Sequence, residues 1–289
     1  MEDFVIVTDS SADLPSSYLQ EHGIVLMSLS YTYDGEHFYS NDEETAKSFY
    51  DKIRNGSMPT TSQVNPDEAA KVINSALEIS KNVLCLSFSS GLSGTYNSTR
   101  IAAEMISDER DDVNIVVIDT VAASLGQGLL VHKAVCMKEA GKSMDEIAQW
   151  VEENKNHIVH IVTVSDLFHL YRGGRVKKAA AVVGTMINLK PILNVDNEGK
   201  LNNIKNARGR KKALSTLVDY MDEHMGLYKD SNDIVFISHS DAEEDAKAVA
   251  DTIKEKFGIE NFLINPIGPV IGSHTGPDTI ALFFMGETK

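Results

Sequence analysis

The chain has 289 residues, and its 42% hydrophobic and 24% charged residues are ordinary for a soluble globular protein. A formal net charge of -15 at pH 7 repels phosphate backbones and argues against nucleic acid as the main partner. No apolar run approaches the roughly 18 residues of a membrane span, and no secretory signal precedes the first apolar segment. We therefore expect a cytoplasmic protein that is long enough for two packed units.

Short apolar runs rich in Val, Ile and Phe predict buried strands, and amphipathic patterns between them predict helices. The strands are predicted at residues 4–9, 82–89, 113–119, 158–164, 191–195, 200–203, 233–239, 262–267 and 280–285. The helices are predicted at residues 67–80, 143–153, 210–224 and 240–257. Their starts carry capping signals, namely Asn65 before Pro66 and two capping boxes, Ser143 with Glu146 and Ser240 with Glu243.

The order of these elements predicts an α/β fold of two domains. Strand and helix alternate in the first half, which is typical of a parallel sheet covered by helices. Residues 196–199 indicate a tight hairpin and therefore antiparallel pairing in the second half. We predict a Rossmann-like N-terminal α/β domain over residues 1–156 and a C-terminal α+β domain over residues 157–289, with segments free to cross between them.

Cysteine and histidine patterns predict neither a disulfide nor a metal site. Cys85 and Cys136 lie far apart in the sequence, among apolar neighbours, and they lack the spacing of zinc ligands. The nine histidines contain no HExxH pattern. We expect two buried, reduced thiols and no metal.

Segment 90–97, Ser-Gly-Leu-Ser-Gly-Thr-Tyr-Asn, follows a predicted strand, where ligands of parallel sheets bind. Its glycines allow a close approach to the backbone, and the start of the next helix favours an anion. Ser93 and Thr95 add hydroxyl donors. Because no P-loop, GxGxxG pattern or following lysine is present, the segment suits one weak charge such as a carboxylate. A capped helix with a glycine-rich turn and no ligand explains the same residues.

Two further segments carry polar residues that suit a binding site. Residues 59–63 contain three consecutive hydroxyl side chains before the Asn65 cap, a pattern that a plain polar loop also explains. Residues 268–277 form a predicted loop between two strands and place His274 among glycines. A simple chain reversal with an incidental histidine is the alternative for this loop.

Two basic clusters interrupt the acidic background. Arg172 and Arg175 flank a Gly-Gly pair, which indicates a shaped loop, and Arg208 lies near three more basic residues at 210–212. A local basic patch on an acidic protein can bind a phosphate-bearing ligand or an acidic partner. A solvated face explains the same charges without any partner.

Taken in order, the motifs resemble the DegV family, whose characterised members are the fatty-acid-binding subunits of bacterial fatty acid kinase. The matching segments are 8–14, 61–63, 90–96, 171–175, 190–192 and 268–277, and they cover nearly the whole chain. Thr120 follows Asp119 where the family pattern usually has serine, and this change keeps the hydroxyl.

The resemblance implies an apolar tunnel for one long-chain fatty acid near the domain junction. It implies that Thr61 and Ser93 hydrogen-bond the carboxylate and that Ser62, the Gly94 N–H and His274 complete the site. A buried carboxylate needs such donors, whereas each buried CH₂ contributes about 0.8 kcal/mol to binding.

The resemblance also implies a partner kinase that uses ATP to phosphorylate the bound carboxylate, giving an acyl phosphate for phospholipid synthesis. Arg172, Arg175 and Arg208 would contact this kinase or its nucleotide phosphates. The chain itself would then be a non-catalytic lipid-binding subunit without a cofactor of its own. At most it would make transient contact with a membrane surface.

Two rival functions remain open from the sequence. Ser93, Asp119 and His274 occur in the Ser…Asp…His order of a serine hydrolase or esterase, although the glycine directly after Ser93 departs from GxSxG. This rival predicts that a fluorophosphonate probe labels Ser93. A regulatory or DNA-binding protein is suggested by the basic clusters alone, and the net charge opposes it.

Overall fold

Four parallel strands form the first sheet, because apolar runs that are buried on both faces suit a sheet covered by helices. They are β1 (Val5–Asp9), β2 (Val25–Met27), β6 (Asn82–Ser87) and β7 (Asn114–Asp119), in the order β2-β1-β6-β7. One face packs against α3 (Pro66–Leu77) and α4 (Thr95–Glu109), and the other against α5 (Leu125–Glu139) and α6 (Met144–Asn154). The computed structural model describes residues 3–40, 46–177 and 188–289.

The second sheet is mixed and has the order β10-β9-β8-β13-β11-β12. Its strands are β8 (Ile158–Thr163), β9 (Leu189–Val195), β10 (Leu201–Arg208), β11 (Val235–His239), β12 (Phe262–Pro266) and β13 (Ile280–Met285). Neighbours pair antiparallel except β11 and β12, which are parallel. Helices α9 (Arg210–His224) and α10 (Glu243–Phe257) cover one face of this sheet.

A small third sheet, in the order β4-β3-β5, consists of β3 (Ser30–Tyr33), β4 (Glu36–Tyr39) and β5 (Thr60–Ser62). Together with α2 (Ala46–Arg54) it encloses a cluster of aromatic side chains. The remaining helices within the described residues are α1 (Ser16–Glu21), α7 (Phe168–Arg172) and α11 (Pro269–Thr275), with 3-10 turns at Ser10–Ala12, Lys155–His157 and Gly226–Ser231.

The strands of the small sheet come early in the sequence, but the neighbouring helix α2 forms hydrogen bonds and ion pairs with the C-terminal half. The Tyr50 hydroxyl donates to the Ile267 carbonyl at 2.8 Å. Arg54, at the end of α2, forms ion pairs with Asp241 and Asp278, the latter at 2.7 Å. These contacts hold α2 against the C-terminal half, and β5 of the small sheet contacts α11.

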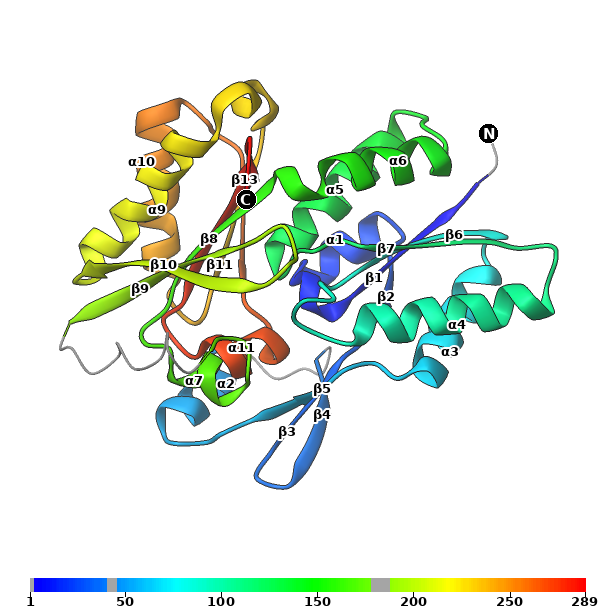
Figure 1. Ribbon diagram of the computed structural model, residues 1–289, viewed down its shortest axis with the longest axis horizontal. Helices are drawn as coiled ribbons and strands as arrows, with labels where there is room; N and C mark the ends of the chain where they lie inside the picture. The colour runs from blue at the N-terminus through cyan, green and yellow to red at the C-terminus, as the bar shows by residue number, and fades with distance from the viewer. Residues whose placement is uncertain (1–2, 41–45, 178–187) are drawn as a thin grey trace.

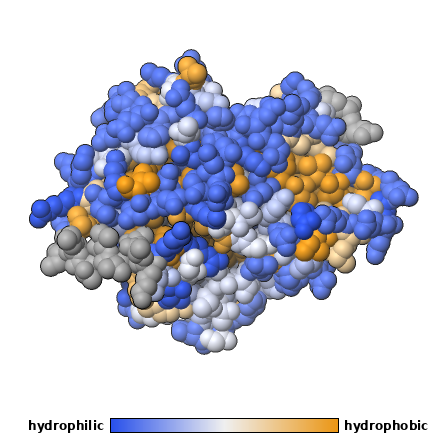
Figure 2. All heavy atoms as spheres, in the orientation of Figure 1, coloured by the Kyte–Doolittle hydropathy of each residue, from blue (hydrophilic) through white to orange (hydrophobic). Residues whose placement is uncertain are grey.

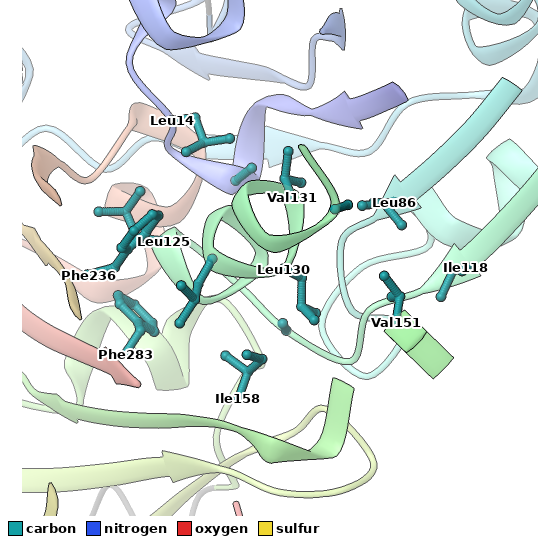
Figure 3. Packing of buried hydrophobic residues seen from close by; sticks show 14 of the residues in the cluster. Leu14, Leu86, Ile118, Leu125, Leu130, Val131, Val151, Ile158, Phe236 and Phe283 are labelled. Atoms are coloured by element: carbon teal, nitrogen blue, oxygen red, sulfur yellow. The ribbon is translucent and has the colours of Figure 1, made fainter. Parts of the chain in front are cut away.

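Helix α5 lies between the two large sheets and contacts both of them (Figure 1). Its leucines join one continuous hydrophobic core, in which Ile158, Phe236 and Phe283 of the mixed sheet pack near Leu125 and Leu130 (Figure 3). The predicted α/β class, with a parallel sheet in the first half and a mixed sheet in the second, is therefore confirmed. The domain boundary at residues 156 and 157 stays a prediction.

Two of the three predicted helix caps are present. Asn65 and Ser143 each form a reciprocal capping box, with Glu68 and Glu146 respectively. The predicted capping box at Ser240 was wrong, because α10 begins three residues later at Glu243 and no side chain caps it. The backbone N–H of Ser240 instead donates to the Thr279 carbonyl at 2.9 Å, which holds this residue against β13.

Several other predictions needed correction. The loop predicted at residues 268–277 contains helix α11, which starts with Pro269 in its first turn and ends before Gly276 at a φ of 74°. Residues 60–62 form a strand, and β10 continues to Arg208. Cys136 is exposed on α5, whereas Cys85 is buried as predicted. Sequence patterns missed β2 to β4, α1, α2 and α7, which are all short, and Arg172, expected in a loop, ends helix α7.

Hydrophilic residues cover most of the face drawn in Figure 2, and hydrophobic areas interrupt this cover over the parallel-sheet half. Among the helices that the structure describes, none is long and apolar enough to cross a bilayer. Within the same described ranges, no three His, Cys, Asp or Glu side chains group as metal ligands.

Candidate functional site

A cavity of about 360 Å³ lies where the three sheets meet, and α7 and α11 line one end of it. That end is polar and contains Thr61, Ser62, Ser93 and His274. The rest of the wall is mainly apolar and comes from β8, β9 and β13 with neighbouring loops, through Val162, Val164, Leu193, Val195, Ala281 and Phe283. The combination of a small polar end with long apolar walls suits an amphipathic ligand.

Thr61 and His274 meet at the polar end although 213 residues separate them in sequence. Their Oγ1 and Nε2 atoms are 2.8 Å apart. Thr61 is held by the pairing of β5 with β3, opposite Tyr31, and His274 lies in the last turn of α11. The packing of α2 against α11 brings these two elements together.

The imidazole of His274 is kept neutral. Burial, together with the nearby Arg175 and Arg172, lowers the pKa of His274 to about 3. Its Nδ1 atom faces the backbone of Gly173, where an added Cβ would come within 2.0 Å of that nitrogen. The histidine therefore pairs with Thr61 through Nε2 and carries no charge of its own near neutral pH.

Ser93 and Gly94 precede α4, whose 15 residues begin at Thr95. The Ser93 hydroxyl lies 2.9 Å from the Thr95 hydroxyl and accepts the Thr95 N–H at 3.2 Å. Gly94 does not contribute to the cavity wall, but within the described part of the chain its N–H has no backbone acceptor. The end of the Gln63 side chain packs directly against Gly94, where a Cβ would displace it.

Two of the three predicted arginines lie near the polar end. Arg175 lines the cavity, and its guanidinium donates to the Leu92 carbonyl at 3.1 Å and to the Gly173 carbonyl. Arg172 donates to the carbonyls of Pro59 and Ser273 at 2.8 and 3.1 Å. Neither arginine forms an ion pair with a carboxylate in the described ranges, so both retain positive charge for an outside anion.

Arg208 lies elsewhere. It is exposed near the end of β10 and lines a separate surface groove of about 380 Å³. This groove shares no wall residue with the cavity and carries both basic and acidic side chains, including Lys212 and Asp219. The structure therefore groups Arg172 and Arg175 but not Arg208.

The rival hydrolase triad is not assembled. His274 pairs with Thr61, and the carboxylate of Asp119 accepts the N–H groups of Ser90 and Val121 at 3.1 and 3.0 Å. A triad requires the acid to hold the histidine and the histidine to contact the serine. The geometry gives the hydrolase hypothesis no support.

Sequence reasoning missed a buried polar junction beside the cavity. The Asp13 carboxylate accepts the Gly268 N–H at 2.9 Å and the hydroxyl of Ser124, a residue of the cavity wall with a φ of 53°. Burial raises the pKa of Asp13 to about 7. Asp13 therefore joins the loop after β1 to the start of α11. The polar segment that follows β1 was the available signal, but its partner 255 residues away was not visible.

Comparisons with known proteins agree with this geometry. Residues 3–287 match the model of a family described as uncharacterised proteins of the DegV family. A DegV domain-containing protein of Clostridium perfringens is 45% identical over all of this chain and 99% of its own. The structure resembles a fatty-acid-binding DegV family protein from Thermus thermophilus, with a TM-score of 0.87, 32% identity and coverage of 99% and 100% of the two chains. It also resembles a stearic-acid-binding protein from Eubacterium ventriosum, with a TM-score of 0.87, 26% identity and 98% coverage of each chain.

Proposed function

The chain belongs to the DegV family, and we propose that it binds one long-chain fatty acid in the cavity described above. The observation that carries this proposal is the cavity itself, which joins a cluster of uncharged hydrogen-bonding groups to long apolar walls. Proteins of similar fold and more than 25% identity are described as binding fatty acids. The carboxylate would lie at the polar end and the acyl chain along the walls.

Carboxylate binding at this end is physically reasonable. A buried carboxylate is costly unless several donors satisfy its oxygens. Thr61, Ser62 and Ser93 offer hydroxyls, the Gly94 N–H has no other described backbone acceptor, and neutral His274 orients Thr61. The uncompensated charge of Arg175 on the cavity wall adds electrostatic attraction for the anion.

The apolar walls supply most of the affinity. Each CH₂ group that leaves water contributes about 0.8 kcal/mol, so a chain of many methylenes binds tightly even in a site with few polar contacts. The hydrogen bonds then determine which end of the ligand lies at the surface. With this orientation the carboxylate stays close to the exposed Ser62 and to solvent.

We further propose that the chain is non-catalytic and presents the acid to a partner kinase, which uses ATP to form an acyl phosphate for phospholipid synthesis. Arg172 and Arg175 at the polar end would meet the partner or its phosphates there. Arg208 would contribute from the separate groove only if the partner spans both surfaces. Transient contact with a membrane surface would accompany loading of the acid.

The first test is mass spectrometry of the organic extract of the purified protein, together with native mass spectrometry of the intact chain. We expect close to one fatty acid per chain and a reduced amount in a Ser93→Ala variant. A protein that is empty and takes up no added fatty acid would overturn the proposal. Labelling of Ser93 by a fluorophosphonate probe would then be the next measurement.

A further inference from the structure

One face of the mixed sheet forms one wall of the cavity. Because side chains alternate between the two faces of a strand, the residues that line this wall show the direction in which the cavity runs. Val164, Val162 and His160 of the β8 segment line the cavity, whereas Val159 and Ile161 point to the opposite core. Because β13 follows α11 and Ile280 pairs with Thr163, the helix that carries His274 lies at the carboxyl end of β8. The cavity therefore runs from Val164, near the polar end, back toward His160.

Along β8, His160 is the lining residue farthest from the polar end. This residue pairs across the sheet with Phe283, and their rings meet edge to face with centroids 5.2 Å apart. The next residue on the same face of β8 is Ile158, which is fully buried and lies outside the cavity wall. Figure 3 shows Ile158 beneath α5, close to Leu130. Packed core thus begins directly behind the imidazole.

The imidazole of His160 is fixed in place. Its Nδ1–H donates to the Ile158 carbonyl at 2.9 Å, and its Nε2 accepts the Ala123 N–H at 3.2 Å. Gly126 of α5 packs against the ring so closely that an added Cβ would lie 2.2 Å from Nε2. An aliphatic side chain could change rotamer to admit a longer ligand, but a ring held by two backbone groups and a helix cannot do so at small cost.

We propose that His160 forms the closed end of the acyl tunnel and sets the longest saturated acyl chain that this protein accepts. The inference rests on the proposed function, since it concerns the same ligand. Four residues of strand separate Val164 from His160, which corresponds to about 13 Å of sheet surface. Within that length each added methylene buries more apolar surface and tightens binding about fourfold, and beyond it a longer chain meets the ring.

The test is competition among fatty acids of different length. Purified protein is incubated with an equimolar mixture of saturated acids from 10 to 20 carbons, washed and extracted, and the bound acids are quantified by mass spectrometry. We expect the amount of bound acid to rise with acyl-chain length up to a limit and to drop sharply for acids longer than this limit. His160→Ala removes a ring about two carbon–carbon bonds deep. In this variant the acyl-chain length at which binding drops should increase by roughly two carbons.

A second variant should shorten the tunnel instead of lengthening it. Ala281 lines the cavity one step nearer the polar end, opposite Val162, so Ala281→Leu should move the drop to shorter acids. Its neighbour Leu282 points to the opposite face of the sheet, and Leu282→Val serves as the matched control with an unchanged length profile.

The outcomes separate the two proposals. If neither the wild type nor any variant retains a fatty acid, the proposed function fails and this inference fails with it. If acids bind but His160→Ala keeps the length profile of the wild type, fatty-acid binding stands and the role of His160 is overturned. Should His160→Ala not fold, Phe283→Leu opens the cavity at the same level of the sheet, and an unchanged length profile in that variant overturns the closed end.

Discussion

In the proposed site, carboxylate binding would depend most directly on the hydroxyls of Thr61 and Ser93. Both line the polar end of the cavity, and Thr61 is oriented by His274 at 2.8 Å. We expect Thr61→Ala or Ser93→Ala to weaken fatty-acid binding by about 1–3 kcal/mol, because the buried carboxylate loses a donor. Isothermal titration with a single fatty acid measures this change.

The control for these variants is Ser90→Ala. Ser90 lies in the same glycine-rich segment but is exposed and outside the cavity wall. Its replacement should leave the affinity unchanged within error. Unchanged affinity in both Thr61→Ala and Ser93→Ala would remove the carboxylate site from this end of the cavity.

Arg172 and Arg175 lie close together in sequence but face different surroundings. Arg175 lines the cavity, whereas Arg172 is not part of its wall. We expect Arg172→Ala to leave fatty-acid binding intact and to impair phosphorylation by the partner kinase, and Arg175→Ala to weaken both. Binding assays paired with ATP-dependent acyl phosphate formation distinguish the two roles. Equal loss of both activities in Arg172→Ala would assign that arginine to the pocket or to folding.

At the scale of elements, the buried Asp13 carboxylate joins the loop after β1 to α11 and makes stability depend on pH. Burial raises the pKa of Asp13 from 3.8 to about 7, so the folded protein binds a proton that the unfolded chain releases. Stability from this group is therefore fully present below pH 4 and is lost as pH rises through about 7. The loss amounts to a few kcal/mol.

Comparison with Asp13→Asn isolates this contribution. Asparagine keeps an oxygen for the Gly268 N–H and cannot ionise, so the free energy of unfolding should change less between pH 5 and pH 8 than in the wild type. Denaturant unfolding at several pH values measures the difference. Parallel pH profiles for the two proteins would show that Asp13 is ionised in both the folded and the unfolded states.

At the scale of the whole molecule, the cavity takes residues from both halves of the chain, so a bound acid should stabilise the entire fold. At a ligand concentration of 100 Kd the stabilisation is about 2.7 kcal/mol. We expect a rise in Tm of roughly 5 °C or more when lipid-stripped protein is reloaded with a fatty acid. Differential scanning calorimetry gives this value directly.

The methyl ester of the same acid is the control for the role of the carboxylate. It offers the same apolar chain but no negative charge to Thr61, Ser93 and Arg175. A smaller rise in Tm is therefore expected. An equal rise with acid and ester would mean that the polar end of the cavity does not recognise the carboxylate.

The sequence by itself determined the local features. Apolar runs predicted most strands of the two large sheets, because buried strands need such runs whatever surrounds them, but they did not predict β2. Asn65 and Ser143 predicted their helix starts because a capping box spans only four residues. The ordered motifs were enough to predict the family. The cap predicted at Ser240 failed because a contact with Thr279, 39 residues away, competed with the local pattern.

Only the tertiary structure decided which residues share the site. Thr61 meets His274 through β5 and α11, and no local rule links positions 213 residues apart. Arg175 faces the cavity and Arg208 does not, although both belong to similar basic clusters. His160 is one polar residue in an apolar strand of the sequence, and only the tertiary structure shows it on the cavity wall, packed against α5 and Phe283. The physical reason is that a cavity is space left between packed elements, and its shape depends on how distant segments fit together.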